Sequence, residues 1–139
     1  MESQLSPSDI VNKMLLHDAF SKWLGIEILA LKKGYCKLSI TVTGDMLNGF
    51  HIAHGGITYS ISDSALAFAS NSYGQKCVSV ETSISHIAPV KAGDKLTAVA
   101  IEKSRTNKIG IYEVTVYNQE QILVALFKGN VYITNKIWE

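Results

Sequence analysis

Residues 55–72 read GGITYSISDSALAFASNS and form the one long segment of the chain without strand character. Within it, Ile57, Ile61, Ala65 and Phe68 recur at the spacing of one helical face. The many serines and alanines would let a sheet or a partner helix approach this segment closely. We therefore expect a long central helix here.

Strand signals lie on both sides of this helix. Before it, residues 26–31 and 36–42 read as strands, and the second run alternates apolar and polar side chains. After it, four further runs read as strands, at residues 77–87, 95–103, 109–118 and 121–133. Asn118–Glu120 predicts a tight hairpin that makes the last two strands antiparallel neighbours. This order predicts an α+β fold in which an antiparallel sheet packs on the central helix.

The N-terminal segment predicts a further helical region over about residues 7–24. Ser6 is placed to cap it, Pro7 suits the first helical position and Asp9 suits the first turn. Apolar residues then follow at helical spacing, and Gly25 is a plausible stop.

The length of 139 residues predicts a single domain over residues 1–139. A net charge of +1 without a basic run argues against DNA or RNA as a partner. Cys36 and Cys77 lie in apolar runs and read as buried thiols in a reducing compartment. No signal peptide or uninterrupted apolar span is present in the sequence, so we expect a soluble, cytoplasmic protein that does not enter a membrane.

The charged fraction of 18% is below the roughly 25% of an average soluble domain. A small protein with so few charges is expected to turn part of its surface towards another subunit.

The densest set of chemically useful residues is NGFHIAHGGITYSISD, residues 48–63. The Gly55-Gly56 pair would leave the first backbone N–H groups of the helix unblocked, and such an end can polarise a carbonyl or hold an oxyanion. Asp63 lies mid-helix, where aspartate has poor propensity and is costly to bury. A solvent-exposed Asp63 is the competing interpretation, and spacing alone leaves the choice open.

Gly55 and Asp63 are eight residues apart, which is about 12 Å along a helix axis. One helix cannot bring both into the roughly 3 Å contacts that chemistry needs. If they cooperate, Gly55 of one protomer must meet Asp63 of another, which requires a dimer with two central helices side by side.

These residues resemble the phenylacetic-acid-degradation thioesterases of the hotdog-fold superfamily. The family pattern Asn-x-x-Gly/His-x-x-His-Gly-Gly, followed by a helical Asp, is matched at residues 48–56 and at Asp63. The likeness extends over nearly the whole chain, through the segments HDAF (17–20), LGI (24–26), PVKAGDKL (89–96) and VALFKG (124–129).

The resemblance implies a hotdog fold, with a five- to six-stranded antiparallel sheet around the long helix. It implies acyl-CoA substrates, often aryl or arylacetyl thioesters, with coenzyme A as part of the substrate and no separate cofactor. It also implies a homo-oligomer, a dimer of dimers whose active sites are shared between two chains. By position, Asp63 matches the catalytic carboxylate, Gly55 the amide that polarises the carbonyl, and His54 and Asn48 supporting positions.

A thioester needs little more than one carboxylate and one oxyanion donor, because thiolate is a good leaving group. Asp63 could activate water as a general base or attack directly to form an anhydride, and the sequence does not separate these routes.

Weaker candidates would bind the substrate. Ser104–Lys108 is a polar, basic connection expected to meet the CoA phosphates. The full set of substrate-binding candidates is Gly56, Ser79, His86, Lys91, Arg105, Thr106, Asn107 and Lys108, with Lys128 as a lesser one. Glu81 could be a second carboxylate at the site, although a solvated strand residue is the favoured interpretation. At His86-Ile87-Ala88 the chain departs from the aromatic and Arg or Ser common in relatives, which leaves the substrate preference open.

Two other functions stay open. A hotdog domain could bind acyl-CoA without hydrolysing it, or could act as a hydratase or dehydratase with His54 and Asp63 as its pair. His51 and His54 have the spacing of a metal-binding pair, but no third ligand is evident in the sequence and the resemblance implies none, so we expect no metal.

Overall fold

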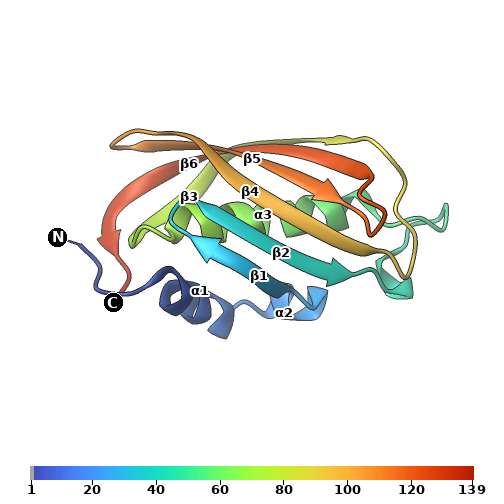
Figure 1. Ribbon diagram of the computed structural model, residues 1–139, viewed down its shortest axis with the longest axis horizontal. Helices are drawn as coiled ribbons and strands as arrows, with labels where there is room; N and C mark the ends of the chain where they lie inside the picture. Colours follow the sequence, from blue (N-terminus) through green and yellow to red (C-terminus); the bar gives the residue numbers. More distant parts are fainter. Residues whose placement is uncertain (1) are drawn as a thin grey trace.

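A long helix enclosed by a curved sheet dominates the fold (Figure 1). The computed structural model describes residues 2–139. Its helices are α1 (Pro7–Leu16), α2 (Ala19–Leu24) and α3 (Gly55–Asn71), with a short 3-10 turn, η1 (Gly44–Met46), ahead of α3. Its strands are β1 (Glu27–Lys32), β2 (Tyr35–Thr41), β3 (Gln75–His86), β4 (Lys95–Arg105), β5 (Ile109–Tyr117) and β6 (Leu123–Ile137).

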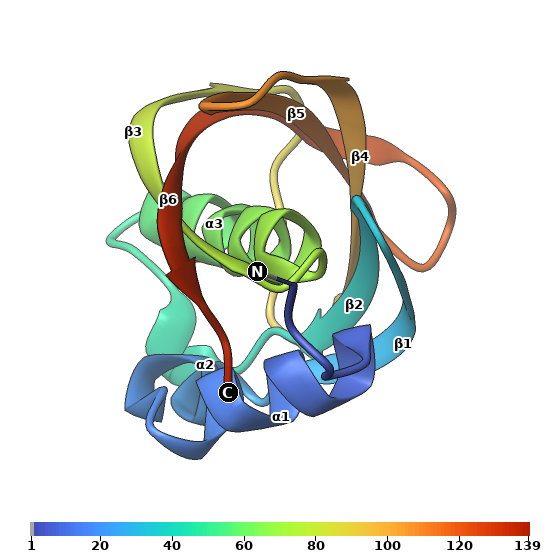
Figure 2. The ribbon, with the colours of Figure 1, turned by 90° about the vertical axis from the view of Figure 1, so that its left-hand side faces the viewer.

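The six strands form one antiparallel sheet in the order β1-β2-β4-β5-β6-β3. The strand that directly follows α3 thus pairs with the last strand of the chain, and β3 is left at one edge of the sheet. The sheet curves around α3, and α1 and α2 lie across the side that it leaves open (Figure 2). The expected α+β arrangement, with the sheet wrapped around the long helix, is confirmed.

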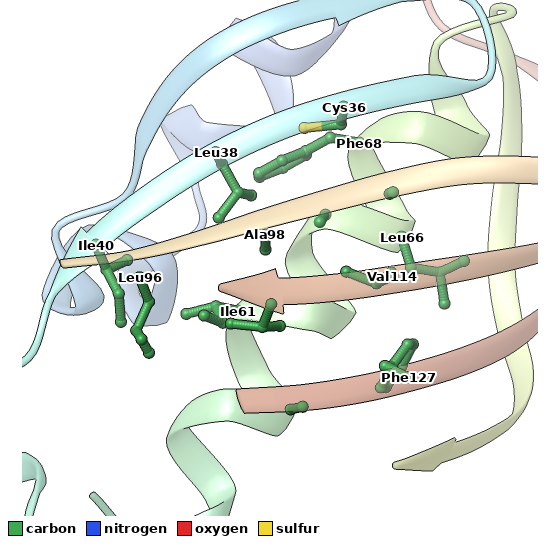
Figure 3. Close-up of a cluster of buried hydrophobic side chains, with 14 of the residues drawn as sticks. Cys36, Leu38, Ile40, Ile61, Leu66, Phe68, Leu96, Ala98, Val114 and Phe127 are labelled. Carbon is green, nitrogen blue, oxygen red and sulfur yellow. The ribbon is translucent and has the colours of Figure 1, made fainter. Parts of the chain in front are cut away.

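The core lies between α3 and the concave face of the sheet. Alternate strand residues face the helix, and several of them meet α3 side chains in one cluster (Figure 3): Cys36, Leu38, Ile40, Leu96, Ala98, Val114 and Phe127 against Ile61, Leu66 and Phe68. Burying each large apolar side chain contributes roughly 1.5–3 kcal/mol, so this contact fixes the rotation of α3 about its axis.

The fixed rotation leaves one stripe of α3 uncovered by the sheet. Gly56, Ser60, Asp63 and Ala67 follow one another at helical spacing, and all four retain solvent exposure. A mid-helix Asp is tolerated because it lies on this stripe.

The N-terminal helical region contains two helices where one run was expected. Asp18 starts α2 by accepting a hydrogen bond from the Ser21 amide at 3.0 Å, and its own backbone N–H closes α1 by donating to the Leu15 carbonyl at 3.2 Å. Aspartate is a strong helix cap, and this local signal overrides the continuous apolar spacing. The predicted ends are confirmed: Ser6 caps α1 and Gly25 ends α2 in a left-handed conformation.

The boundaries of β6 and β4 also differ from the prediction. The last strand begins at Leu123 and continues to Ile137, because the Asn118 side chain accepts hydrogen bonds from the amides of Glu120 and Ile122 and so lengthens the turn. β4 runs on to Arg105, past an irregularity between Glu102 and Ser104, so part of the expected polar connection is strand. The antiparallel pairing of β5 with β6 is confirmed.

Candidate active site

The N-terminus of α3 presents one free backbone donor. The His54 ring caps the helix by accepting a hydrogen bond from the Gly56 amide through Nδ1 at 2.9 Å, and the His54 carbonyl accepts from the Ile57 amide at 2.8 Å. Within residues 2–139 the Gly55 N–H has no acceptor. It combines an unsatisfied donor with the partial positive charge of the helix end, as an oxyanion-binding group requires.

Each of the two glycines makes room for an imidazole ring. A Cβ on Gly55 would lie 3.1 Å from Nε2 of His86, and a Cβ on Gly56 would lie 3.1 Å from Nδ1 of His54. Neither glycine has a positive φ. The Gly-Gly pair is therefore explained by close approach of the rings rather than by backbone conformation.

A cavity of about 370 Å³ opens at Gly55. Its polar lining comes from Asn48, Thr58 and His86, and the rest is mainly apolar: Ile52, Ala53, Ile87, Ala88, Pro89, Val90 and Val124. Asn48 is partly buried, and its side-chain oxygen accepts a hydrogen bond from the Phe50 amide at 2.9 Å, which holds the loop ahead of α3. Of the residues predicted for the site, the structure thus brings Gly55, Asn48 and His86 together.

His54 and Gly56 lie instead at a second hollow of about 340 Å³ on the other side of the helix end. Phe20 and Trp23 of α2 line this hollow as a pair with ring centroids 5.9 Å apart, and Ser60 lines it from α3. Both aromatic side chains are about half exposed.

Asp63 lies farther along the uncovered stripe of α3. Ser21 ties α2 to α3 through a 2.9 Å contact with Ser64, and it also donates to Asp18 at 2.6 Å. Burial raises the pKa of the Asp63 carboxyl, and the nearby charge of Asp18 raises it further. No cation compensates it: the one ion pair in the described part of the chain joins Lys103 and Glu113.

The α3 helix is continuous from Gly55 to Asn71, so Gly55 and Asp63 remain about 12 Å apart along its axis. Within one protomer they do not meet. His54 does not pair with Asp63 either, because its ring caps the helix at the far end.

The remaining candidates on the sheet lie on outward-facing surfaces. Ser79 and Glu81 are exposed on the edge strand β3, Lys91 is exposed in the loop before β4, and Lys128 is exposed on β6. Among residues 2–139 no three His, Cys, Asp or Glu side chains gather in the manner of a metal site.

The basic connection divides into two parts. The Arg105 guanidinium stacks on Tyr73 at 3.9 Å and reaches the carbonyl of Ser70 and the hydroxyl of Tyr112, each at 3.4 Å. Glu102 accepts from both tyrosine hydroxyls at 3.0 Å and completes this network.

Thr106, Asn107 and Lys108, by contrast, are exposed. The whole connection lies near the C-terminal end of α3, the opposite end from Gly55, since Arg105 contacts Ser70.

Thr58 is the site residue that sequence reasoning missed. Its hydroxyl donates to the Gly55 carbonyl at 3.1 Å and contacts Nδ1 of His86 at 3.3 Å. The only available signal was its position one turn after Gly55, which an ordinary helical threonine shares.

In residues 2–139 no helix combines the length and hydrophobicity that a membrane crossing requires.

Known proteins are similar to this chain in sequence and in fold. Residues 50–125 match the family described as the Thioesterase superfamily. The acyl-coenzyme A thioesterase PaaI of Escherichia coli (strain K12) is 40% identical over 116 residues, which are 84% of this chain and 83% of that protein.

Two solved structures superpose closely on this chain. The E. coli PaaI protein from the phenylacetic acid degradation operon superposes with a TM-score of 0.92 at 36% identity, covering 94% of this chain and 95% of that one. The smu.793 protein of Streptococcus mutans UA159, solved bound to acetyl CoA, superposes with a TM-score of 0.79 at 26% identity, covering 81% and 91%. The chain therefore belongs to the thioesterase superfamily and has its hotdog fold.

Proposed function

We propose that the protein hydrolyses acyl-CoA thioesters to the free acid and CoA. The observation that carries this proposal is the free Gly55 N–H at the start of α3, which opens into a mainly apolar cavity. The similarity to the E. coli acyl-CoA thioesterase supports it, and so does the likeness to a protein solved with acetyl CoA.

In this mechanism the thioester carbonyl oxygen accepts a hydrogen bond from the Gly55 amide, which stabilises the oxyanion as the carbonyl is attacked. Asp63 acts as general base on a water or as the nucleophile itself. Its uncompensated, partly buried carboxylate suits either role. His54 and Gly56 hold the helix end in shape, and Asn48 orders the loop beside the carbonyl.

The site would be completed by a second protomer. A symmetric pair in which each Gly55 faces the other Asp63 sets the two α3 helices antiparallel, with Tyr59 at the midpoint. The exposed stripe of small residues on α3 would allow this approach. On the edge strand β3, Val78 and Val80 are 56% and 62% exposed in the single chain, which further favours a covered surface. A dimer of such dimers is the proposed assembly, in the cytoplasm.

For the CoA moiety we propose Thr106, Asn107 and Lys108, with Lys91 as a further contact. Ser79 is a further proposed contact of the substrate. Because the first three lie at the far end of α3 from Gly55, they would act on a site in another protomer. An aryl or arylacetyl group is the proposed acyl part.

A thiol-release assay on phenylacetyl-CoA, benzoyl-CoA and straight-chain acyl-CoAs tests the proposal. We expect hydrolysis by the wild type and a loss of about 10²–10⁴-fold in kcat for Asp63→Asn. Tight acyl-CoA binding without thiol release would indicate a binding module, and hydration of an enoyl-CoA would indicate a hydratase. Equal turnover by the variant would contradict the role of Asp63.

A further inference from the structure

We propose that His86 positions the attacking water by accepting one of its hydrogen bonds through Nε2. This inference rests on the proposed hydrolysis and adds a residue to it. His86 lies at the end of β3 and reaches the first turn of α3, 28 residues away in sequence from its contact Thr58. It touches the Gly55 region directly, with Nε2 3.1 Å from the place of a Gly55 Cβ.

The hydrogen-bond network assigns the tautomer of His86. The Thr58 hydroxyl has one proton, and it donates that proton to the Gly55 carbonyl at 3.1 Å. We assign the Thr58 proton to the Gly55 carbonyl because that is the shorter of its two contacts, and with this assignment Nδ1–H of the imidazole is the donor in the 3.3 Å contact between Thr58 and His86. A neutral imidazole with its proton on Nδ1 presents a lone pair on Nε2. The ring is thus held as an acceptor.

That acceptor has nothing else to bind in the described part of the chain. Nε2 has no hydrogen-bond partner among residues 2–139, and His86 is one of the residues that line the cavity at Gly55. Among the lining residues His86 is the only titratable side chain, and Ile52, Val90 and Val124 make much of the remaining wall apolar. A donor entering beside Gly55 therefore finds one side-chain nitrogen acceptor, on His86.

A water molecule is the donor that the reaction requires there. The water would give one hydrogen bond to Nε2 of His86 and its other proton to the carboxylate of Asp63 of the partner protomer. Its oxygen forms the new bond to the carbonyl carbon while the Gly55 N–H holds the carbonyl oxygen. The carbon–sulfur bond then breaks, and the CoA thiolate takes the proton from Asp63. His86 gains and loses no proton in this sequence, so it is a positioning residue.

Three variants test this role. His86→Phe keeps a ring of similar size and removes the acceptor, and we expect kcat to fall about 10–100-fold with KM changed less than about twofold. His86→Gln can place an amide oxygen near the former Nε2, and it should retain kcat within about fivefold of the wild type. Gly55→Ala inserts a methyl group 3.1 Å from Nε2 and should displace the ring, giving a loss like that of His86→Phe.

The dependence of kcat on pH distinguishes a His86 that positions water from a His86 that only packs against its neighbours. Protonation of an imidazole turns its acceptor nitrogen into a donor, so the wild type should lose kcat towards acid pH. In His86→Gln this acid limb should move to lower pH, where only the protonation of Asp63 remains. If the His86 ring served only to pack the site, the acid limb of the kcat profile would be the same in His86→Gln as in the wild type.

The outcomes are distinguishable from those of the proposed function. Wild-type kcat and an unchanged acid limb in His86→Phe, with Asp63→Asn inactive, would overturn the role of His86 and leave the hydrolysis intact. A rise in KM alone would overturn it too, since it would make His86 a substrate contact. Circular dichroism and sedimentation of each variant verify that fold and assembly are kept.

Discussion

At the scale of single residues, Asp63 carries a charge that the fold disfavours. Burial and Asp18 raise the pKa of its carboxyl, so the folded protein holds this proton more tightly than the unfolded chain does. Stability is therefore lost as the pH rises through the pKa of the folded state, and the loss is complete above it. We expect Asp63→Asn to raise the melting temperature at pH 8 and to bring little gain near pH 4.

Thermal unfolding of both proteins across that range is the measurement. Asp9 serves as a control, because its hydrogen bonding with Ser6, whose amide donates to the Asp9 carboxylate, lowers the pKa of that carboxyl and gives the opposite sign. A lower melting temperature for Asp63→Asn at pH 8 would mean that the assembled protein compensates the carboxylate.

Gly55 allows its backbone N–H to be tested by itself. Proline suits the first position of a helix, and His54 before it already has the extended conformation that a following proline prefers. Gly55→Pro removes the N–H, while Gly55→Ala adds a Cβ and keeps the N–H. We expect the proline variant to have a kcat about 10²–10³-fold below the alanine variant. Equal rates in the two variants would exclude the amide as the oxyanion donor.

The site was predictable at this scale where its residues are neighbours in sequence. His54, Gly55 and Gly56 form one motif, and the free donor at the helix end follows from helix geometry. The pairing of Thr58 with His86 was not predictable, because it depends on where the end of β3 meets the first turn of α3. The reason for two glycines was likewise not visible, since the rings that they accommodate come from different segments.

At the scale of elements, the extension of β4 changes the role expected of Arg105. Its guanidinium belongs to the network with Tyr73, Tyr112 and Glu102, and Tyr112 is fully buried. Burial, with the charge of Glu102, raises the pKa of Tyr112, so its hydroxyl stays protonated and keeps donating. We expect Arg105→Gln to lower the free energy of unfolding by about 1–3 kcal/mol, since it removes the guanidinium that stacks on Tyr73 and donates to the Ser70 carbonyl and the Tyr112 hydroxyl.

The same change should alter the KM for acyl-CoA by less than about twofold, whereas Lys108→Gln should raise it about two- to fivefold and leave stability unchanged. Denaturant unfolding and steady-state kinetics of the two variants decide this. If Arg105→Gln instead raised the KM for acyl-CoA and left the free energy of unfolding unchanged, Arg105 would be a contact of the CoA phosphates.

Element boundaries were predictable where a cap or a turn residue marks them, as Ser6 and Gly25 do. Asp18 shows the limit of periodicity, because one capping side chain divided a continuous apolar pattern into two helices. The end of β4 was not predictable for a related reason: Arg105 reads as a polar loop residue until Tyr73 and Glu102 are placed beside it.

At the scale of the whole molecule, the order of helices and strands was predictable and the order of strands in the sheet was not. Hydrophobic patterns indicate each strand, but they do not say that β3 pairs with β6. That pairing leaves β3 at an edge with Val78 and Val80 exposed, and it leaves one stripe of α3 uncovered. The helix geometry, in contrast, indicates a second protomer from the sequence alone if Gly55 and Asp63 cooperate, because their separation depends only on residue count.

A shared site can be tested by mixing two inactive variants. In a symmetric dimer of Gly55→Pro with Asp63→Asn, one site receives both changes and the other receives an intact Gly55 and an intact Asp63. Random pairing of equal amounts makes half of the dimers mixed, so about one quarter of the wild-type activity should return.

Co-expression with two different tags, followed by tandem purification, isolates the mixed dimer, which should have about half the wild-type kcat per dimer. If both residues acted within one protomer, each chain would keep its own defect and mixing would restore nothing. Val80→Lys on the β3 edge is the companion variant. It should shift sedimentation to a smaller species and abolish activity together, because in the proposed assembly a lone protomer would hold only half of each site.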